Sequence, residues 1–406
     1  MSLKVHDLLS DERKARFAEE LGFELPPYRL PYEDFNTDYG VGVIGLHWVV
    51  QIMHLPAYQA ARFNVVGAAE NNPDAVDIVK RKRLIDPDAF FTDDYKKLIS
   101  RDDVQILDSS FGHKPDKQLK KLELAKLCAE AGKTLLLHKP IASTLQVAED
   151  ILKVSEDSGV PICVNQNCRY NPAAYTMKEL LKPERLGQPL IIELQHYWRG
   201  DPRPADNMRA AVMQHVIHHA DLIRYWVGSP CVSVYSRCQQ NSNLTIYQFA
   251  NGTVAYHMEN HSGIKQHTNK IRIQTEKGII EGSHNWDWHI GSARGRDVVK
   301  VCRNTREDAF ELPLPELIYE PHWSDINKWL PHKGPYYDIA APVAGMMGCV
   351  GSIMKGLSEG KKPDNHVSGG VESLRMALGA ELSSERNQPV KPEEVPLDYT
   401  TSTEPL

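Results

Sequence analysis

The chain has 406 residues, which is too long for one ordinary domain and favours two domains that each bury a core. It is 41% hydrophobic and 25% charged, and its formal net charge of −6 gives no reason to expect nucleic acid or an anionic membrane as a partner. No segment has the pattern of a signal peptide or of a transmembrane helix. The seven cysteines form no C-x-x-C pair, so we expect free thiols and a cytoplasmic location.

Residues 1–38 form a polar segment before the first apolar run. Residues 4–21 have the spacing of one helix. The proline-spaced stretch at 26–31 is predicted to be extended, because proline restricts φ and lacks a backbone donor. We expect this segment to be an arm that wraps over the following domain or over a neighbouring subunit.

Between residues 39 and 166, strands alternate with helices. Short apolar runs predict strands at 41–45, 63–69, 104–108, 134–137 and 160–164. Helical spacing falls between them, at 48–62, from 73 onward, at 117–131 and at 144–158. This alternation predicts a doubly wound parallel sheet of the Rossmann type, which is an α/β fold.

The pattern changes between residues 167 and 385. Consecutive strands are predicted at 191–198, 232–237, 244–249, 254–258 and 270–274. Asn251 and Gly252, between two of these strands, are a strong hairpin signal. Helices are predicted at about 208–227, 337–358 and 368–385. We expect an α+β domain with an open, mostly antiparallel sheet, followed by a tail at 386–406.

The turn after the first predicted strand is a candidate nucleotide-binding loop. It reads Gly45, Leu46, His47, Trp48, Val49 and Val50. A turn of the pattern G-x-G-x-x-G/A lets a pyrophosphate sit on backbone N–H groups at a helix N-terminus. Only Gly45 meets that pattern. His47 stands where backbone and phosphate approach closely, and its bulk requires a displaced turn, although an imidazole can donate to a phosphate.

Glu70 ends the second predicted strand. An acidic side chain at this position accepts hydrogen bonds from ribose hydroxyls and repels a 2′-phosphate. Together with Gly45, His47 and Trp48, it indicates a dinucleotide site that favours NAD over NADP.

Several motifs follow one another in a recognisable order. These are the Gly45 turn, the run Met-His-Leu-Pro-Ala at 53–57, His138-Lys139-Pro140 after a strand, His218 on a helix of the second domain, and the run at 368–390. This order resembles the glucose–fructose oxidoreductase/inositol dehydrogenase (Gfo/Idh/MocA) family over about residues 40–395. The resemblance implies an NAD(P)-dependent oxidoreductase that acts on a sugar, a cyclitol or a related polyol.

The resemblance also implies roles for residues at the edge of the first sheet. The family pattern there is Glu-Lys-Pro; Lys139 and Pro140 match it, whereas His138 replaces the glutamate. Lys139 is then expected to polarise the reacting hydroxyl, with a pKa depressed beside a nicotinamide cation. His138, and His113 in an earlier loop, are implied to lie next to the cofactor.

The second-domain motif of the family has an aspartate, a histidine four residues later and an aspartate three further on. The matching residues are Gln214, His218 and Asp221, and His215 and His219 flank His218. His218 therefore matches the acid/base group, which takes the hydroxyl proton while hydride leaves the carbon. Gln214 cannot ionise, so it shortens the proton relay at this catalytic position. Asp221 is expected to orient a neighbour.

Other residues are expected to border the substrate, which would lie between the nicotinamide and the second sheet. They come from the segment that links the domains, from the sheet and from the histidine-rich helix: Asn167, Arg169, Tyr170, Tyr197, Arg199, His215 and His257.

Two hypotheses differ in whether the chain turns over a cofactor. The leading one is an NAD-dependent sugar or polyol dehydrogenase. The second is a ligand-binding protein of the same fold without activity, because His47, His138 and Gln214 all depart from the family pattern.

A third hypothesis is a metal-dependent lyase or hydrolase that acts on sugars. His215, His218 and His219 have the i, i+3 and i, i+4 spacing that suits two imidazoles on one ion, with His257, His138 or a carboxylate as a further ligand. Under each hypothesis we expect a homodimer or homotetramer, because an open sheet often pairs with a copy of itself.

Overall fold

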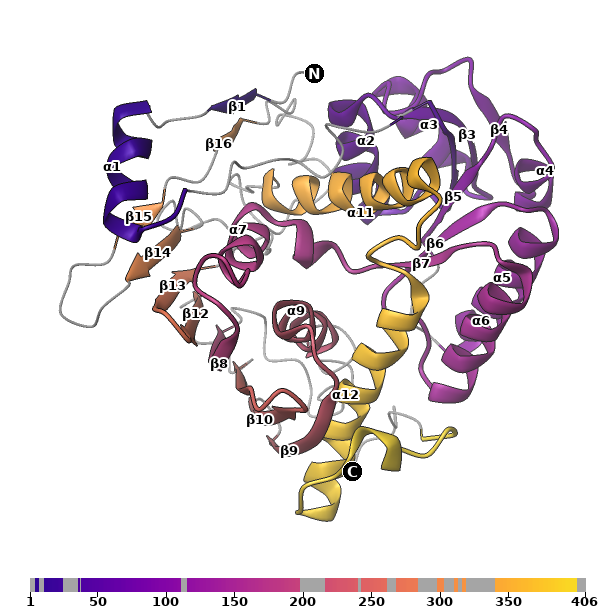
Figure 1. Cartoon of the computed structure of the whole chain (residues 1–406). Helices are drawn as coiled ribbons and strands as arrows, with labels where there is room; N and C mark the ends of the chain where they lie inside the picture. Colours follow the sequence, from indigo (N-terminus) through magenta and orange to yellow (C-terminus); the bar gives the residue numbers. More distant parts are fainter. Residues whose placement is uncertain are drawn as a thin grey trace.

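The computed structural model describes residues 4–6, 11–24, 36, 38–110, 115–197, 216–239, 242–260, 268–283, 298–302, 310–312, 316–318 and 340–399. Two large sheets organise this part of the chain, one with six parallel strands and one with eight mostly antiparallel strands (Figure 1). The predicted fold class is thereby confirmed. Among these residues, no helix combines the length and the apolar character that crossing a bilayer requires.

The first sheet has the strand order of a Rossmann fold, β4-β3-β2-β5-β6-β7. Its strands are β2 (Gly40–Ile44), β3 (Asn64–Ala69), β4 (Phe90–Thr92), β5 (Ile106–Ser109), β6 (Thr134–His138) and β7 (Ile162–Asn165). The order reverses between β2 and β5, which pair in parallel. In such sheets ligands bind in the crevice at this reversal, beyond the carboxyl ends of the strands.

Helices cover both faces of the first sheet. They are the π-helical turn η1 (Val50–His54), α2 (Leu55–Ala61), α3 (Pro73–Arg81), α4 (Tyr95–Ile99), α5 (Pro115–Glu130) and α6 (Leu145–Ser158). Helix α6 shows why these bounds follow from the sequence. The Thr144 side chain accepts from the Val147 backbone N–H, and Gly159 ends the helix in the left-handed conformation. The short β4 and α4 carry too few residues for a periodic pattern and were not predicted.

The second sheet has the order β15-β14-β13-β12-β8-β11-β10-β9. Its strands are β8 (Pro189–Tyr197), β9 (Cys231–Gln239), β10 (Ser242–Phe249), β11 (Val254–Asn260), β12 (Thr268–Thr275), β13 (Ile279–Ser283), β14 (Val298–Cys302) and β15 (Phe310–Leu312). The predicted hairpin around Asn251 and Gly252 is confirmed, because β10 and β11 pair antiparallel across it. Strand β8 pairs in parallel with β11 and antiparallel with β12.

Five further helices pack against the sheets and against one another. These are the short helix η2 (Asn167–Tyr170), α7 (Pro172–Leu180), α9 (Ile217–Val227), α11 (Ala340–Glu359) and α12 (Val367–Arg386). Helix α11 lies along the first sheet although it comes late in the chain (Figure 1). Its Met346, Val350 and Met354 share one buried core with Val41 and Val43 of β2. The C-terminal helices therefore contribute to the core of the N-terminal sheet.

The N-terminal segment differs from the single predicted helix at 4–21. Strand β1 (Lys4–His6) pairs antiparallel with β16 (Glu316–Ile318), and helix α1 (Asp11–Leu21) begins only at Asp11. Pairing with a distant strand overrides the local helical spacing of the first residues. The predicted extended stretch at 26–31 lies outside the described residues.

Candidate functional site

The candidate site begins at the carboxyl edge of the first sheet, where the strand order reverses. Gly45 follows β2 with φ of +88°, a conformation that L side chains rarely adopt, so glycine is required at this turn. The backbone N–H of Leu46 donates to Glu70 Oε2 over 2.6 Å, and that of Asn72 donates to Glu70 Oε1 over 2.9 Å. Glu70 therefore sits against the turn, at the end of β3.

The His47 ring reaches from the turn after β2 to the end of β5. Its Nε2 lies 3.0 Å from the Ser110 carbonyl oxygen and also contacts Ser110 Oγ. Burial lowers the pKa of His47, so the ring is neutral at pH 7. It thus spans the crevice where the strand order reverses. Trp48, the next residue, is exposed.

A buried polar network that sequence reasoning missed lies behind this turn. His54 Nδ1 lies 2.7 Å from Asp108 Oδ2, and the Tyr58 hydroxyl donates to the same oxygen over 2.7 Å. His54 Nε2 has no hydrogen-bond partner among the described residues. The 53–57 run drew attention to His54 in the sequence, but only the sheet places it beside Asp108 at the end of β5.

His138 joins this network from the end of β6. Its ring centroid lies 6.1 Å from that of His54 and 6.5 Å from that of His47. Burial, and then the charges of His54 and Lys139, lower the pKa of His138 well below its ordinary value. The site therefore presents a cluster of neutral His47 and His138 rings at the edge where a cofactor would lie.

Lys139 follows β6 and is held in place by a second lysine. Lys121 on α5 is fully buried, and its Nζ donates to the carbonyl oxygens of His138 at 2.9 Å and Pro140 at 2.6 Å. These carbonyls flank Lys139 on both sides. Burial lowers the pKa of Lys139 to about 8, and burial together with the Lys139 charge lowers that of Lys121 to about 7. Lys121 gave no sequence signal beyond its place in an amphipathic helix.

His218 approaches the same region from the second domain. It lies in the first turn of α9, is 5% exposed, and its Nδ1 is 3.4 Å from the sulfur of Cys168. The Cys168 thiol donates to Asn167 Oδ1 over 3.8 Å. Cys168 is also close enough to Lys139 to act on the pKa of that lysine. Lys139 and His218, predicted from separate motifs, thus both interact with Cys168, which sequence reasoning missed.

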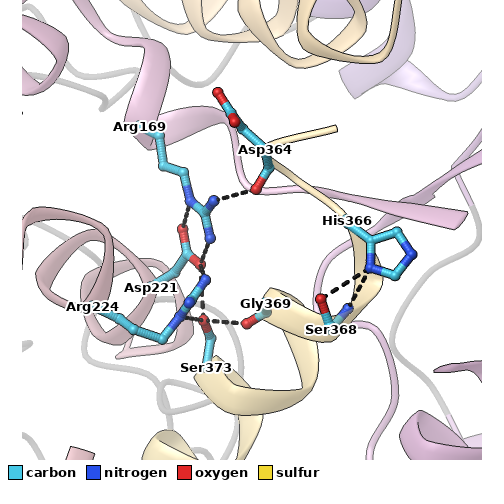
Figure 2. A network of polar contacts seen from close by, with 8 residues as sticks. All are labelled: Arg169, Asp221, Arg224, Asp364, His366, Ser368, Gly369 and Ser373. Atoms are coloured by element: carbon cyan, nitrogen blue, oxygen red, sulfur yellow. Dashed lines mark hydrogen bonds and ion pairs between the residues drawn. The ribbon is translucent and has the colours of Figure 1, made fainter. Parts of the chain in front are cut away.

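Arg169, expected to border the substrate, is instead part of a buried ion pair. Its Nε donates to Asp221 Oδ2 over 2.6 Å, its Nη2 contacts Asp221 Oδ1, and its Nη1 donates to the Asp364 carbonyl oxygen over 2.8 Å (Figure 2). Arg169 is 3% exposed and Asp221 is 1% exposed. Ser373 of α12 donates to Asp221 Oδ1 over 2.8 Å. This network links η2, α9 and α12.

The charge state of Asp221 follows from these contacts. Burial alone would raise its pKa, but the charge and hydrogen bonds of Arg169 outweigh burial, so the net pKa is lowered. Asp221 is therefore an ionised anchor for Arg169, in line with the orienting role expected from the sequence.

Three other residues expected near the substrate lie in different surroundings. Tyr170 is 2% exposed and belongs to the core that includes helix α11. Tyr197 lies on the opposite face of β8 from the buried His196, and its hydroxyl donates to the sulfur of Met258 over 3.2 Å. His257 faces inward from β11 and is fully buried. His113, Arg199, Gln214 and His215 lie outside the described residues.

Comparisons with known proteins agree with this architecture. Residues 175–281 match the family model of the GFO/IDH/MocA C-terminal domain. An inositol 2-dehydrogenase from Saccharopolyspora erythraea is 26% identical over 159 residues, which cover 39% of this chain and 42% of that protein. The match thus spans less than half of the length of that curated relative.

Solved structures extend the likeness to nearly the whole fold. An oxidoreductase from Agrobacterium radiobacter in complex with NAD+, L-tartaric acid and magnesium has a TM-score of 0.70 at 14% identity, covering 88% of this chain and 99% of that chain. A levoglucosan dehydrogenase in complex with NADH and levoglucosan has a TM-score of 0.68 at 19% identity, with the same coverage. These TM-scores and coverages establish a shared fold, and with the family model they confirm the resemblance predicted from the motifs.

Proposed function

We propose that the chain is an NAD-dependent dehydrogenase of a sugar, cyclitol or related polyol, because residues 175–281 match the GFO/IDH/MocA C-terminal domain and the whole fold resembles that of known oxidoreductases. One observation carries the proposal. His218, from α9, lies 3.4 Å from the sulfur of Cys168, and Lys139, from the edge of the first sheet, interacts electrostatically with the same cysteine. A polarising cation and a proton acceptor at one place suit the oxidation of a secondary alcohol. The names of relatives, an inositol dehydrogenase and a levoglucosan dehydrogenase, support this substrate class.

The residues at the first turn fit a dinucleotide. A Cβ at Gly45 would meet Ser110 in ordinary van der Waals contact at 3.9 Å, so the turn itself is not crowded by its neighbours. Glu70, already held by two backbone N–H groups, keeps lone pairs for ribose hydroxyls and places negative charge where NADP carries its 2′-phosphate. His47 must turn away from Ser110 to admit a pyrophosphate. The nicotinamide, when bound, supplies the hydride acceptor.

The protein's own part of the reaction is proton handling and orientation. Lys139, as an ammonium, donates a hydrogen bond to the substrate oxygen. The Cys168 thiol donates to Asn167, so its sulfur can accept from His218 Nδ1–H. In that tautomer Nε2 is the acceptor of the ring, and it takes the hydroxyl proton. Cys168 and Asn167 thus orient the His218 ring, whereas Gln214, at the matching position of the family motif, cannot ionise.

Cofactor binding is the direct test of the proposal. In a fluorescence titration of the full chain, NADH should bind saturably and NADPH at least roughly tenfold more weakly, which corresponds to about 1.4 kcal/mol. Gly45→Ala should weaken NADH binding, because φ of +88° disfavours a side chain. His47→Gly should tighten it, because it removes the ring that spans the crevice. If neither the wild type nor His47→Gly binds NADH, the chain is not a dehydrogenase and the ligand-binding hypothesis takes its place.

The pH dependence of turnover should report Lys139. Burial lowers the pKa of Lys139 from 10.5 to about 8, although the charges of Cys168 and Glu259 raise it. Lys139 is the required donor only while protonated, so kcat/KM for oxidation should fall about tenfold per pH unit above pH 8. Lys139→Arg, which stays charged throughout, should lack this limb. If kcat/KM of Lys139→Arg still falls above pH 8, the titrating group is not Lys139 but another residue, such as the nearby Lys121.

We also infer that the outer face of the second sheet pairs with another copy of the chain. Ile191 of β8 and Leu244 of β10 are 38% and 42% exposed. Burying such apolar side chains against an identical face would complete a homodimer or homotetramer.

A further inference from the structure

The buried face of the second sheet changes from apolar to ionisable along two neighbouring strands. On β8 the inward residues are Ile192, Leu194 and then His196; on β11 they are Ala255, then His257 and Glu259. The two strands run parallel, with Glu259 in register with His196. The ionisable residues therefore lie together at the carboxyl ends of these two central strands, and the proton transfers proposed above assign them no role.

A third element brings another histidine to these strand ends. His219 of α9 packs over the sheet, with its ring centroid 4.8 Å from that of His196 and 4.4 Å from that of His257. His196 Nδ1 lies 3.4 Å from Glu259 Oε1, and His257 Nε2 lies 3.7 Å from Glu259 Oε2. All four residues are at most 2% exposed.

We propose that His196, His219 and Glu259 bind one divalent transition-metal ion, and that His257 orients the Glu259 carboxylate. One ligand atom from each of the three lies within 4.8 Å of the others. Ligands at about 2.0–2.2 Å from a tetrahedral ion are separated by roughly 3.4 Å, which is the His196–Glu259 distance. A small rotation of the His219 side chain would bring its ring nitrogen from within 4.8 Å of the other two ligand atoms to this separation.

The donor set and its surroundings indicate the class of ion. Imidazole nitrogens with one carboxylate suit zinc, manganese, iron or cobalt, whereas magnesium and calcium prefer oxygen ligands alone. Two ligands stand on directly paired strands and the third on a helix packed against them, which gives a rigid frame. An ion would also offset the cost of burying a carboxylate among imidazoles.

The proposed metal site lies next to the two residues assigned to proton handling, Lys139 and His218. His219 follows His218 directly in α9, and Glu259 is close enough to Lys139 to act on its pKa. Three protein ligands leave a coordination position open, as in catalytic rather than structural zinc sites. An ion here would hold a substrate oxygen beside Lys139; this last step rests on the proposed function, whereas metal binding itself does not.

Cobalt binding by the full chain tests the proposal. After chelation and dialysis, Co²⁺ should bind at one per chain with visible d–d absorption, and Zn²⁺ should displace it. Glu259→Gln and His219→Asn should each weaken Co²⁺ binding at least roughly 100-fold, and His257→Asn about 10–100-fold, as expected when an orienting partner of a ligand is lost. His366→Asn is the matched control: it removes a buried histidine that caps α12, and asparagine caps equally well, so binding should be unchanged.

Two readouts keep the result decisive. Proton NMR of the cobalt-loaded wild type should show two hyperfine-shifted imidazole N–H signals, one from each histidine ligand, even if a variant fails to fold. Absence of a saturable cobalt spectrum in the wild type, or full retention of it in folded Glu259→Gln, would overturn the site. Neither readout involves NADH, so a failure of cofactor binding would count against the dehydrogenase alone.

Discussion

Lys139→Ala and His218→Asn are each expected to lower kcat/KM for the alcohol substrate by roughly 10²–10⁴-fold, the range for losing one acid/base group. Lys139→Ala should also raise KM, because in the proposed mechanism the ammonium contacts the substrate oxygen in the ground state. His218→Asn should act mainly on kcat, because proton removal belongs to the transition state. Steady-state kinetics with NAD over a panel of sugars and cyclitols makes the measurement.

Two control variants separate these effects from general disturbance. Lys153→Ala removes an exposed lysine that pairs with Asp157 on α6. His366→Asn removes a buried histidine and keeps the cap of α12. Both should retain wild-type kinetics. If Lys139→Ala and His218→Asn also retained them, the assignment of both catalytic residues would be wrong.

Arg169→Met is expected to lower the free energy of unfolding by about 3–5 kcal/mol, because it leaves the Asp221 carboxylate buried without its partner. The double variant Arg169→Met/Asp221→Asn should recover part of this loss, since the uncompensated charge is then gone. Guanidinium denaturation followed by circular dichroism measures both values. Arg81→Ala, which breaks an exposed pair with Asp77 on α3, should cost no more than about 0.5 kcal/mol.

A result in which Arg169→Met and Arg81→Ala cost the same would show that the buried pair contributes little. The expected loss has a functional consequence as well. Asp221 and His218 stand on the same helix, and Arg169 follows Cys168 directly in η2. The ion pair therefore holds His218 against Cys168, so a weakened pair should also disturb the catalytic geometry.

Two of the residues that depart from the family pattern lie close together in the structure. His47 and His138 were separate irregularities in the sequence, yet their rings lie 6.5 Å apart, and the His138 ring lies 6.1 Å from that of His54, which pairs with Asp108. They form one neutral cluster at the edge of the first sheet. Two of the three departures on which the hypothesis of an inactive protein rests are therefore neighbours in space.

Local patterns were sufficient for most of the longer secondary-structure elements and for the fold class. Apolar runs, helical spacing and the Asn251–Gly252 turn depend on neighbours within a few residues, and the elements they predict lie within a few residues of those observed. The Lys139 and His218 motifs were visible for the same reason. Elements of three to five residues, such as β4, α4 and β15, carry too little pattern and were missed.

Tertiary structure alone decided which of these residues meet. The pairing of β8 with β11 brings Glu259 beside His196, and the packing of α9 adds His219. Sequence spacing instead pointed to histidines next to one another on a single helix. Such contacts depend on strand order and helix packing between segments far apart in the chain, and no local periodicity encodes them.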